Sequence, residues 1–281
     1  MAEFRGWLRR NWTTPVILLA IFLVALYLRA YFPWDLAVQD RLLSGGSDSF
    51  YYERIINFNV ETGQQLVRDC RLNYPMCLIN PRPPLYSWTV AVMGKALSPL
   101  FDSVWASVTV VFLSSTAVWG ALTVFPTYFL TKEAFGRRSA ILAAFFLATL
   151  PAHLQRSIAT NADHDAMVLF FVVSGFFFVL KSLKSLQQRN WVQDWSFWTK
   201  DGRTSIRAGL RGFFGENRTA VLYAMLAGWS LTAIALIWQG WAYAPIVLLG
   251  YFLFQILVHR LRSQDPMGIG IVFTITVGLP L

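Results

Sequence analysis

The chain has 281 residues, of which 56% are hydrophobic, 16% aromatic and 14% charged, and its formal net charge is +9. A soluble domain is typically about 45–50% apolar and about 25% charged, so this composition excludes disordered, collagen-like and coiled-coil proteins and nearly all soluble enzymes. We therefore predict an all-α integral membrane protein, a polytopic helical bundle.

Seven apolar stretches are candidates to cross a hydrocarbon core of about 30 Å, which needs about 20 residues per helix. The first is too long for the core of a signal peptide and precedes no small-residue cleavage site, so we interpret it as an uncleaved helix. The last runs to the final residue, so we expect an incomplete helix and a chain that continues. The predicted transmembrane domain occupies residues 1–281, with helices at 15–32, 104–130, 139–154, 166–183, 220–238, 242–258 and 267–281.

The basic residues predict the orientation of these helices. With a cytoplasmic N-terminus, 16 of the 24 Lys and Arg residues fall on the cytoplasmic side, against six acidic residues, as the positive-inside rule requires. The charge thus follows membrane sidedness, and we expect no nucleic-acid partner. The long cytoplasmic loop at 181–218 mixes cations with aromatic residues. We interpret it as a segment lying on anionic lipid headgroups, with a site for a partner protein as the alternative.

A large first external loop at 33–103 lies between the first two predicted helices, and a loop of this length should contain local structure. The pattern predicts one helix that starts near Ser47 and ends at Gly63, and an interfacial helix at 85–97 after a proline run. The two cysteines of the chain, Cys70 and Cys77, lie in this loop. A local disulfide and two free thiols both remain open, whereas two cysteines without other ligands argue against zinc.

Acidic residues at the external boundary of the membrane are the main candidates for chemistry. Asp163 and Asp165 precede the fourth predicted helix, beside His164, and charges at a hydrocarbon edge are costly unless they have partners. Helix capping explains one of the two carboxylates but not both. Oxygen ligands select hard cations such as Mg²⁺ or Mn²⁺, and Asp48 in the first external loop is the candidate third carboxylate. We expect the histidines 153 and 164 to be polar neighbours rather than ligands.

Several motifs resemble the external loops of one enzyme family. They are S-D-S-F-Y-Y at 47–52, Y-P at 74–75 and P-R-P-P-L-Y at 81–86 in the first loop, and R-S-I at 156–158 with D-H-D at 163–165 in the second. Together they resemble the catalytic subunit of oligosaccharyltransferase, the archaeal AglB and bacterial PglB family. The resemblance extends over essentially the whole chain in helix order and sidedness.

This resemblance implies a GT-C glycosyltransferase-like fold and an active face outside the cytoplasm of a multi-pass cell-membrane protein. The implied reaction transfers a glycan, with inversion, from a lipid-linked (pyro)phosphate donor to Asn of an Asn-x-Ser/Thr polypeptide. Asp48, Asp163 and Asp165 would hold Mn²⁺ or Mg²⁺, Asp48 would also contact the acceptor amide, and Arg156 would sit beside the carboxylates. Membrane lipids are the other expected partners.

The chain also departs from the family pattern. The acidic residue of a later external loop, the Trp-Trp-Asp-Tyr-Gly motif and the C-terminal soluble domain do not occur in these 281 residues, which leaves open whether the fragment acts alone. One alternative is another GT-C membrane enzyme, a protein O-mannosyltransferase or a lipid-linked sugar transferase. A second is a non-catalytic transporter or scaffold, although a transporter should carry ionisable residues near the membrane midplane.

Overall fold

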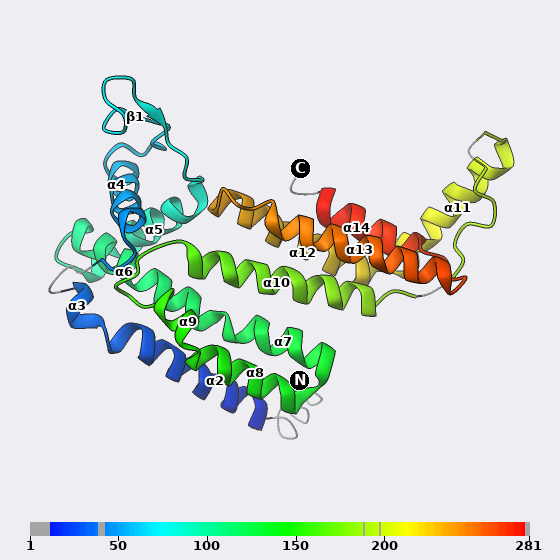
Figure 1. Ribbon diagram of the computed structural model, residues 1–281, viewed down its shortest axis with the longest axis horizontal. Coiled ribbons are helices and arrows are strands. Elements are labelled where there is room, and N and C mark those ends of the chain that lie inside the picture. Colours follow the sequence, from blue (N-terminus) through cyan, green and yellow to red (C-terminus); the bar gives the residue numbers. More distant parts are fainter. Residues whose placement is uncertain (1–11, 39–42, 188, 197, 279–281) are drawn as a thin grey trace. The chain divides into compact units, whose positions relative to one another are not determined.

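The computed structural model describes residues 12–38, 43–187, 189–196 and 198–278, and it is built almost entirely of helices (Figure 1). The chain divides into two compact units. The first comprises residues 1–173 with 236–239, and the second comprises 174–235 with 240–281. The basic residues at positions 5, 9 and 10, used above to predict the orientation, lie outside the described residues.

Within the described part of the chain, five helical segments are long and apolar enough to cross a membrane. They are Thr13–Tyr31, Val104–Phe135, Asp165–Lys184, Arg218–Ile237 and Tyr243–Leu261. Two of the seven predicted helices are shorter than this. Helix α8 (Arg137–Thr149) has 13 residues and α14 (Met267–Gly278) has 12. The predicted all-helical membrane fold is confirmed, while five segments rather than seven reach full spanning length.

The predicted helix at 139–154 is interrupted by Pro151. Leu150 has an extended backbone (φ −63°, ψ 119°), and a separate short helix, α9 (Pro151–Gln155), follows it. A proline disfavours helical geometry in the residue before it and donates no hydrogen bond, which explains the break. The segment therefore turns at residue 150 instead of running straight to 154.

The core of the first unit lies among α2 (Thr13–Leu26), α6 (Val104–Leu122), α7 (Val124–Phe135) and α8. Helix α8 contributes a fully buried stripe of alanines, Ala140, Ala144 and Ala148, spaced four residues apart. Small residues at this spacing allow helix backbones to approach closely, the main source of helix association in lipid. Leu18 and Ile21 of α2 pack in the same core.

A π-helical turn, η1 (Tyr27–Tyr31), extends α2 and carries a fully buried arginine. The Arg29 guanidinium donates to the carbonyl oxygen of Ala148 at 2.8 Å and to that of Leu147 at 3.4 Å, and its Nε donates to Ser157 Oγ at 2.8 Å. Carbonyls in the last turn of a helix have no partner within the helix. Arg29 therefore caps the C-terminal end of α8. The short helix α3 (Trp34–Val38) follows.

Two helices form the body of the segment at 33–103, the predicted first external loop. Helix α4 (Ser47–Thr62) ends at Gly63, which adopts the left-handed conformation (φ 68°) that glycine tolerates best. Helix α5 (Pro84–Leu97) starts with a proline at its first position, where the missing N–H costs nothing. The two helices pack against each other, and α5, followed by the 3-10 turn η2 (Ser98–Leu100), also packs on α6 (Figure 1).

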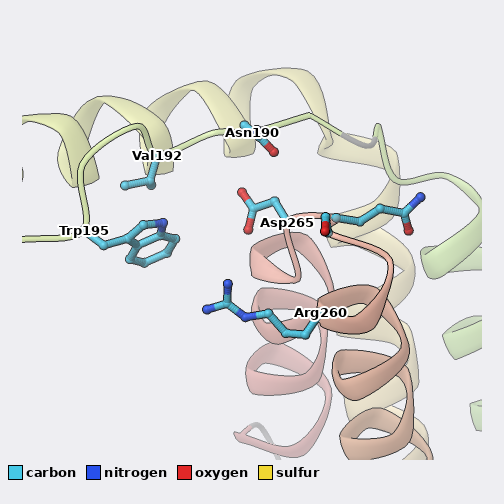
Figure 2. Close-up of a pocket in the computed structure, with 7 residues that line it drawn as sticks. Asn190, Val192, Trp195, Arg260 and Asp265 are labelled. Carbon is cyan, nitrogen blue, oxygen red and sulfur yellow. The ribbon is translucent and has the colours of Figure 1, made fainter.

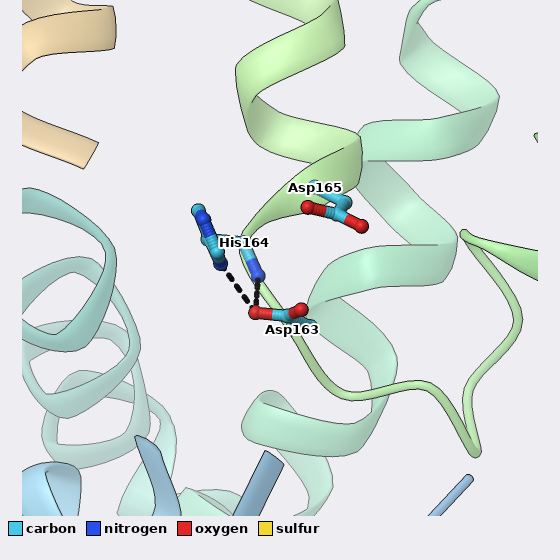
Figure 3. Close-up of side chains that lie close together, drawn as sticks. All are labelled: Asp163, His164 and Asp165. Carbon is cyan, nitrogen blue, oxygen red and sulfur yellow. Dashed lines mark hydrogen bonds and ion pairs between the residues drawn. The ribbon is translucent and has the colours of Figure 1, made fainter. Parts of the chain in front are cut away.

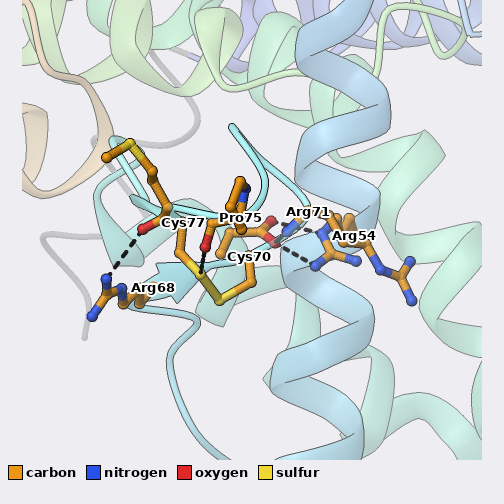
Figure 4. The surroundings of a disulfide bond; sticks show 8 residues. Arg54, Arg68, Cys70, Arg71, Pro75 and Cys77 are labelled. Atoms are coloured by element: carbon orange, nitrogen blue, oxygen red, sulfur yellow. Dashed lines mark hydrogen bonds and ion pairs between the residues drawn. A yellow bond between two sulfur atoms is a disulfide. The ribbon is translucent and has the colours of Figure 1, made fainter.

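A disulfide-bonded hairpin lies between these two helices. Strands β1 (Arg68–Asp69) and β2 (Leu78–Ile79) pair antiparallel, and Cys70 is bonded to Cys77 (Figure 4). The sequence left open whether these cysteines form a disulfide or are two free thiols, and the structure contains the disulfide. Asp69 is 1% exposed and accepts two hydrogen bonds from Arg54 of α4, at 2.7 and 2.6 Å. This ion pair fastens the hairpin to α4.

The second unit contains the end of α10 (Asp165–Lys184), α11 (Lys200–Glu216), most of α12 (Arg218–Ile237), α13 (Tyr243–Leu261) and α14. Ser182 Oγ donates to the carbonyl oxygen of Ala220 at 2.7 Å, which joins α10 to α12. Helix α11 lies within the basic loop at 181–218, where the sequence analysis expected no specific element. Its N-cap is Thr199, whose side chain accepts from the Gly202 N–H at 3.1 Å.

Candidate active site

Three potential metal ligands converge at the start of α10. Ligand atoms of Asp163, His164 and Asp165 all lie within 4.8 Å of one another (Figure 3). Asp163 and His164 are 5% and 3% exposed, while Asp165 is the first residue of the helix. The chain has not yet entered regular helix at Asp163, so side chains two positions apart can face the same point. The structure thus brings together the two acidic residues that the sequence singled out.

Asp163 is held as a carboxylate by its neighbour. Its Oδ1 accepts a hydrogen bond from the His164 backbone N–H at 2.6 Å and is also in contact with His164 Nδ1. Burial opposes ionisation of Asp163, but hydrogen bonding with His164 outweighs that effect and lowers the pKa of Asp163 below the ordinary value. His164 Nε2 is buried and has no hydrogen-bond partner. His164 is therefore an integral part of the cluster.

Arg156, the predicted neighbour of the carboxylates, lies beside Asp165. Its Nη1 is 3.6 Å from Asp165 Oδ2, and the Arg156 side chain is 71% exposed. An ion pair this exposed contributes little to stability. The arginine thus remains accessible to an anionic group from outside the protein.

Asp48 lies in the first turn of α4 and does not belong to the three-residue cluster. Its Oδ1 is ion-paired with Arg82, the arginine of the proline run before α5. Burial, the charge of Asp163 and, to a smaller extent, the charge of Asp48 raise the pKa of Asp165 above its ordinary value. The Asp48 side chain is 38% exposed, so the carboxylate is accessible while Arg82 balances its charge.

Aromatic contacts link the Asp48–Arg82 pair to the cluster. The Tyr52 ring lies 5.2 Å from the His164 ring and 4.9 Å from the Tyr86 ring, and the Arg82 guanidinium lies 5.6 Å above it. Tyr52 is fully buried, yet its hydroxyl has no hydrogen-bond partner. Burial raises the pKa of Tyr52, so the phenol is protonated.

A direct contact between the segment before α4 and the segment before α10 sets the position of α4. The Ser44 N–H donates to the carbonyl oxygen of Thr160 at 2.6 Å, and the two hydroxyls are 2.9 Å apart. Gly45 follows, where a Cβ atom would lie 2.0 Å from Ser49 Oγ and 2.6 Å from Asn161 Oδ1. Only glycine leaves room for this approach. The segment preceding Asp48 is therefore fixed against the segment preceding Asp163.

Sequence reasoning missed two residues of this site, Arg82 and Tyr52. Arg82 lies in the P-R-P-P-L-Y motif, but a basic residue in a proline run gives no signal of its acidic partner 34 positions away. Tyr52 lies in the motif at 47–52, where nothing assigns it a role of its own. His164, expected to be a polar neighbour rather than a ligand, is in contact with Asp163.

Comparison with known proteins identifies the family. The family model described as "Oligosaccharyl transferase STT3, N-terminal" matches residues 14–279. The chain belongs to this family. As an STT3 N-terminal domain it is 26% identical over 281 residues to the dolichyl-phosphooligosaccharide-protein glycotransferase 3 of Archaeoglobus fulgidus. That alignment covers 98% of this chain and 29% of the relative, so the STT3 domain spans about three tenths of the length of this relative.

Solved structures of an oligosaccharyltransferase from Archaeoglobus fulgidus share the fold of the STT3 domain. One, tethered to an acceptor peptide containing the NVT sequon, has a TM-score of 0.75 at 23% identity and covers 98% of this chain and 30% of that one. Another, a complex with Zn and sulfate, has a TM-score of 0.72 at 22% identity, and the match covers 94% of this chain and 30% of that one. The expected GT-C-like membrane fold is thereby confirmed.

Proposed function

We propose that this STT3 domain contributes part of the active site of an enzyme that transfers a glycan from a lipid-linked (pyro)phosphate to Asn of Asn-x-Ser/Thr polypeptides. The supporting observation is the convergence of Asp163 and Asp165 at the start of α10, against the loop that carries Asp48. The relatives support the substrates, since one is named for a dolichyl-phosphooligosaccharide donor and another was solved with an NVT-containing peptide.

The donor set fits a divalent cation. Carboxylate oxygens at 163 and 165 are hard ligands that suit Mg²⁺ or Mn²⁺, and His164 Nε2 is a buried nitrogen without a partner. Asp163, Asp165 and Asp48 would hold the ion, with His164 as a further candidate ligand. When bound, such an ion supplies Lewis-acid charge that stabilises the departing phosphate.

The other residues have roles that follow from their charge and exposure. Asp48 is an exposed carboxylate that can accept a hydrogen bond from the N–H of an acceptor carboxamide, while the ion pair with Arg82 orients it. Arg156 is exposed and presents a guanidinium beside Asp165, where a phosphate oxygen can meet it. With the acceptor held at Asp48 and the leaving phosphate on the opposite side of the sugar, direct displacement inverts the anomeric carbon.

The test is glycan transfer by the full-length protein from a lipid-linked oligosaccharide to an Asn-x-Thr peptide. Asp163→Asn and Asp48→Asn should each lower kcat/KM by about 100-fold or more, because each removes an anion on which the site depends. Asp102→Asn, an exposed acidic residue on the same predicted face, is the matched control and should transfer at the wild-type rate. Chelation of divalent cations should abolish transfer, and Mn²⁺ or Mg²⁺ should restore it. Full activity of either site variant would contradict the proposal.

A further inference from the structure

A polar cavity of about 390 Å³ lies in the second unit, at the end of α13 that leads into α14 (Figure 2). This volume is within the range of about 300–1,000 Å³ that is usual for small-molecule sites. The loop after α10 forms one wall and the turn between α13 and α14 forms the other. Most of the residues that line it are polar, and the exceptions are one valine and one tryptophan. The lining residues are Asn190, Val192, Trp195, Arg260, Ser263, Gln264 and Asp265.

Two opposite charges face this cavity without neutralising each other. The Arg260 guanidinium and the Asp265 carboxylate both point into the space in Figure 2, with Trp195 opposite Asp265. Both side chains are among the described residues, and no ion pair joins them. The cavity therefore offers one site for an anionic group and a separate site for a cationic one.

The Asp265 carboxylate shows which kind of cation suits the cavity. Its Oδ1 accepts the Met267 backbone N–H at 2.9 Å, and no ion pair neutralises the carboxylate among the described residues. A carboxylate forms its strongest hydrogen bonds with positively charged N–H donors. A primary ammonium therefore suits Asp265 better than a cation without N–H groups.

The location of the cavity indicates a lipid. Helix α13 is one of the five candidate membrane spans, and the cavity lies just beyond its last turn, at the depth of lipid headgroups. Trp195 is 48% exposed and Trp198, in the same loop, is 94% exposed. Tryptophan is enriched at this depth because its ring is amphipathic.

We propose that this cavity binds the phosphoethanolamine headgroup of a membrane phospholipid. Arg260 pairs with the phosphate, while the primary ammonium donates to the Asp265 carboxylate and lies against the Trp195 ring. A phosphoglycerol headgroup offers no cation to Asp265. A phosphocholine headgroup offers a cation without an N–H, so it cannot form a hydrogen bond with the Asp265 carboxylate. The proposal is independent of the catalytic function proposed above.

The experiment is lipid retention by the full chain, purified in detergent, incubated with equal amounts of phosphatidylethanolamine, phosphatidylcholine and phosphatidylglycerol, and measured by native mass spectrometry. We expect at least a tenfold preference for phosphatidylethanolamine. Arg260→Met and Asp265→Asn should each reduce its binding to the level of phosphatidylcholine. Arg262→Met is the matched control, since Arg262 is exposed at the same helix end but does not line the cavity.

Three results would overturn the proposal. They are equal retention of the ethanolamine and choline lipids, preference for phosphatidylglycerol, and unchanged selectivity in the Arg260→Met protein. Competition by free O-phosphoethanolamine separates the two sources of this headgroup. If it displaces the lipid at equal concentration, the ligand is a soluble phosphate ester, and the lipid assignment fails. Should Asp265→Asn misfold, Arg260→Met alone decides the outcome.

Discussion

Gly45 shows how one residue without a side chain can govern a site several residues away. It lies where the first external loop meets the second, in contact with Ser49 and Asn161, and both of those residues are buried. A methyl group at this position has no free volume to enter. The buried Ser49 and Asn161 side chains must therefore give way, which disturbs the first turn of α4 where Asp48 lies.

We accordingly expect Gly45→Ala to lower glycan transfer by roughly tenfold or more, since displacements of about 1 Å in a catalytic arrangement have effects of this size. The measurement is kcat/KM of the full-length protein. Gly250→Ala is the matched control, because a Cβ there meets nothing within 4 Å, and transfer should be unchanged. Equal activity of both variants would show that the loop contact does not position Asp48.

The residues of the site differ in how well the sequence predicts them. Asp163 and Asp165 were found because charged side chains beside a hydrophobic run need an explanation. Arg82 and Tyr52 were not, because their importance comes from partners in other elements: a carboxylate on α4 and a ring at the start of α10. Spacing along one segment carries no information about such pairs. The roles of Asp48, Arg156, Asp163 and Asp165 remain predictions.

At the scale of elements, a buried polar network joins the end of α8 to the segment that leads to the site. Arg29 bonds the last carbonyls of α8 and Ser157, and its own carbonyl accepts the Ala159 N–H at 2.9 Å. His153 Nε2 lies 3.2 Å from the carbonyl oxygen of Gly120.

Replacing Arg29 with Met should destabilise the fold by about 3 kcal/mol. The change leaves the Ala148 carbonyl without its Arg29 donor, and a buried unsatisfied group costs about 1–3 kcal/mol. It also removes one of the two hydrogen bonds of Ser157 Oγ, which still donates to the His153 carbonyl. The measurement is thermal unfolding in detergent. Arg138→Met, on the exposed start of α8, should change stability by less than about 0.5 kcal/mol. Identical midpoints for the two variants would contradict the capping role of Arg29.

The hairpin of the first external loop should respond to acid. The hydrogen bonds from Arg54, and to a smaller extent the Arg71 N–H, outweigh burial and lower the pKa of Asp69. A lowered folded-state pKa stabilises the fold above the ordinary carboxyl value of about 3.9, and this stabilisation is lost as the pH falls through the lowered value.

The stability difference between wild type and Asp69→Asn should therefore be constant above about pH 5 and shrink below about pH 4. Thermal midpoints recorded across this range measure it. Glu61→Gln, an exposed acidic residue at the end of α4, should show no such dependence. A difference between wild type and Asp69→Asn that stays constant down to pH 2 would mean that the ion pair does not stabilise the hairpin.

Helix ends illustrate what sequence could and could not predict at this scale. The limits of α4 and α5 followed from local signals, namely Gly63 and the prolines before residue 85. The break at Pro151 was missed because apolar residues continue across it, and hydrophobicity alone does not report backbone geometry. Helix α11 was missed because the residues at 200–216 are mostly polar, and their pattern was interpreted as an interfacial segment without an assigned element.

For the whole molecule, the distribution of charge predicts its orientation. Basic residues gather in the segments that lie inside the cell if the N-terminus is cytoplasmic. A chain with Cys70 and Cys77 changed to Ser offers a direct test. In intact cells, a membrane-impermeant maleimide should label an Asp102→Cys variant, whereas an Arg207→Cys variant should react only after permeabilisation. Both positions are exposed. The reverse pattern would invert the topology, and the chain without added cysteine controls for background.

The contact between Ser44 and Thr160 also has a consequence for biosynthesis. These residues are separated by 116 positions, and at about 5–20 residues per second a ribosome needs roughly 6–23 s to add them. For that interval the newly synthesised segment around Ser44 has no Thr160 to dock on. The Cys70–Cys77 bridge and the Arg54–Asp69 pair join residues 7 and 15 positions apart. These early links can hold the nascent loop in shape until the later segment arrives.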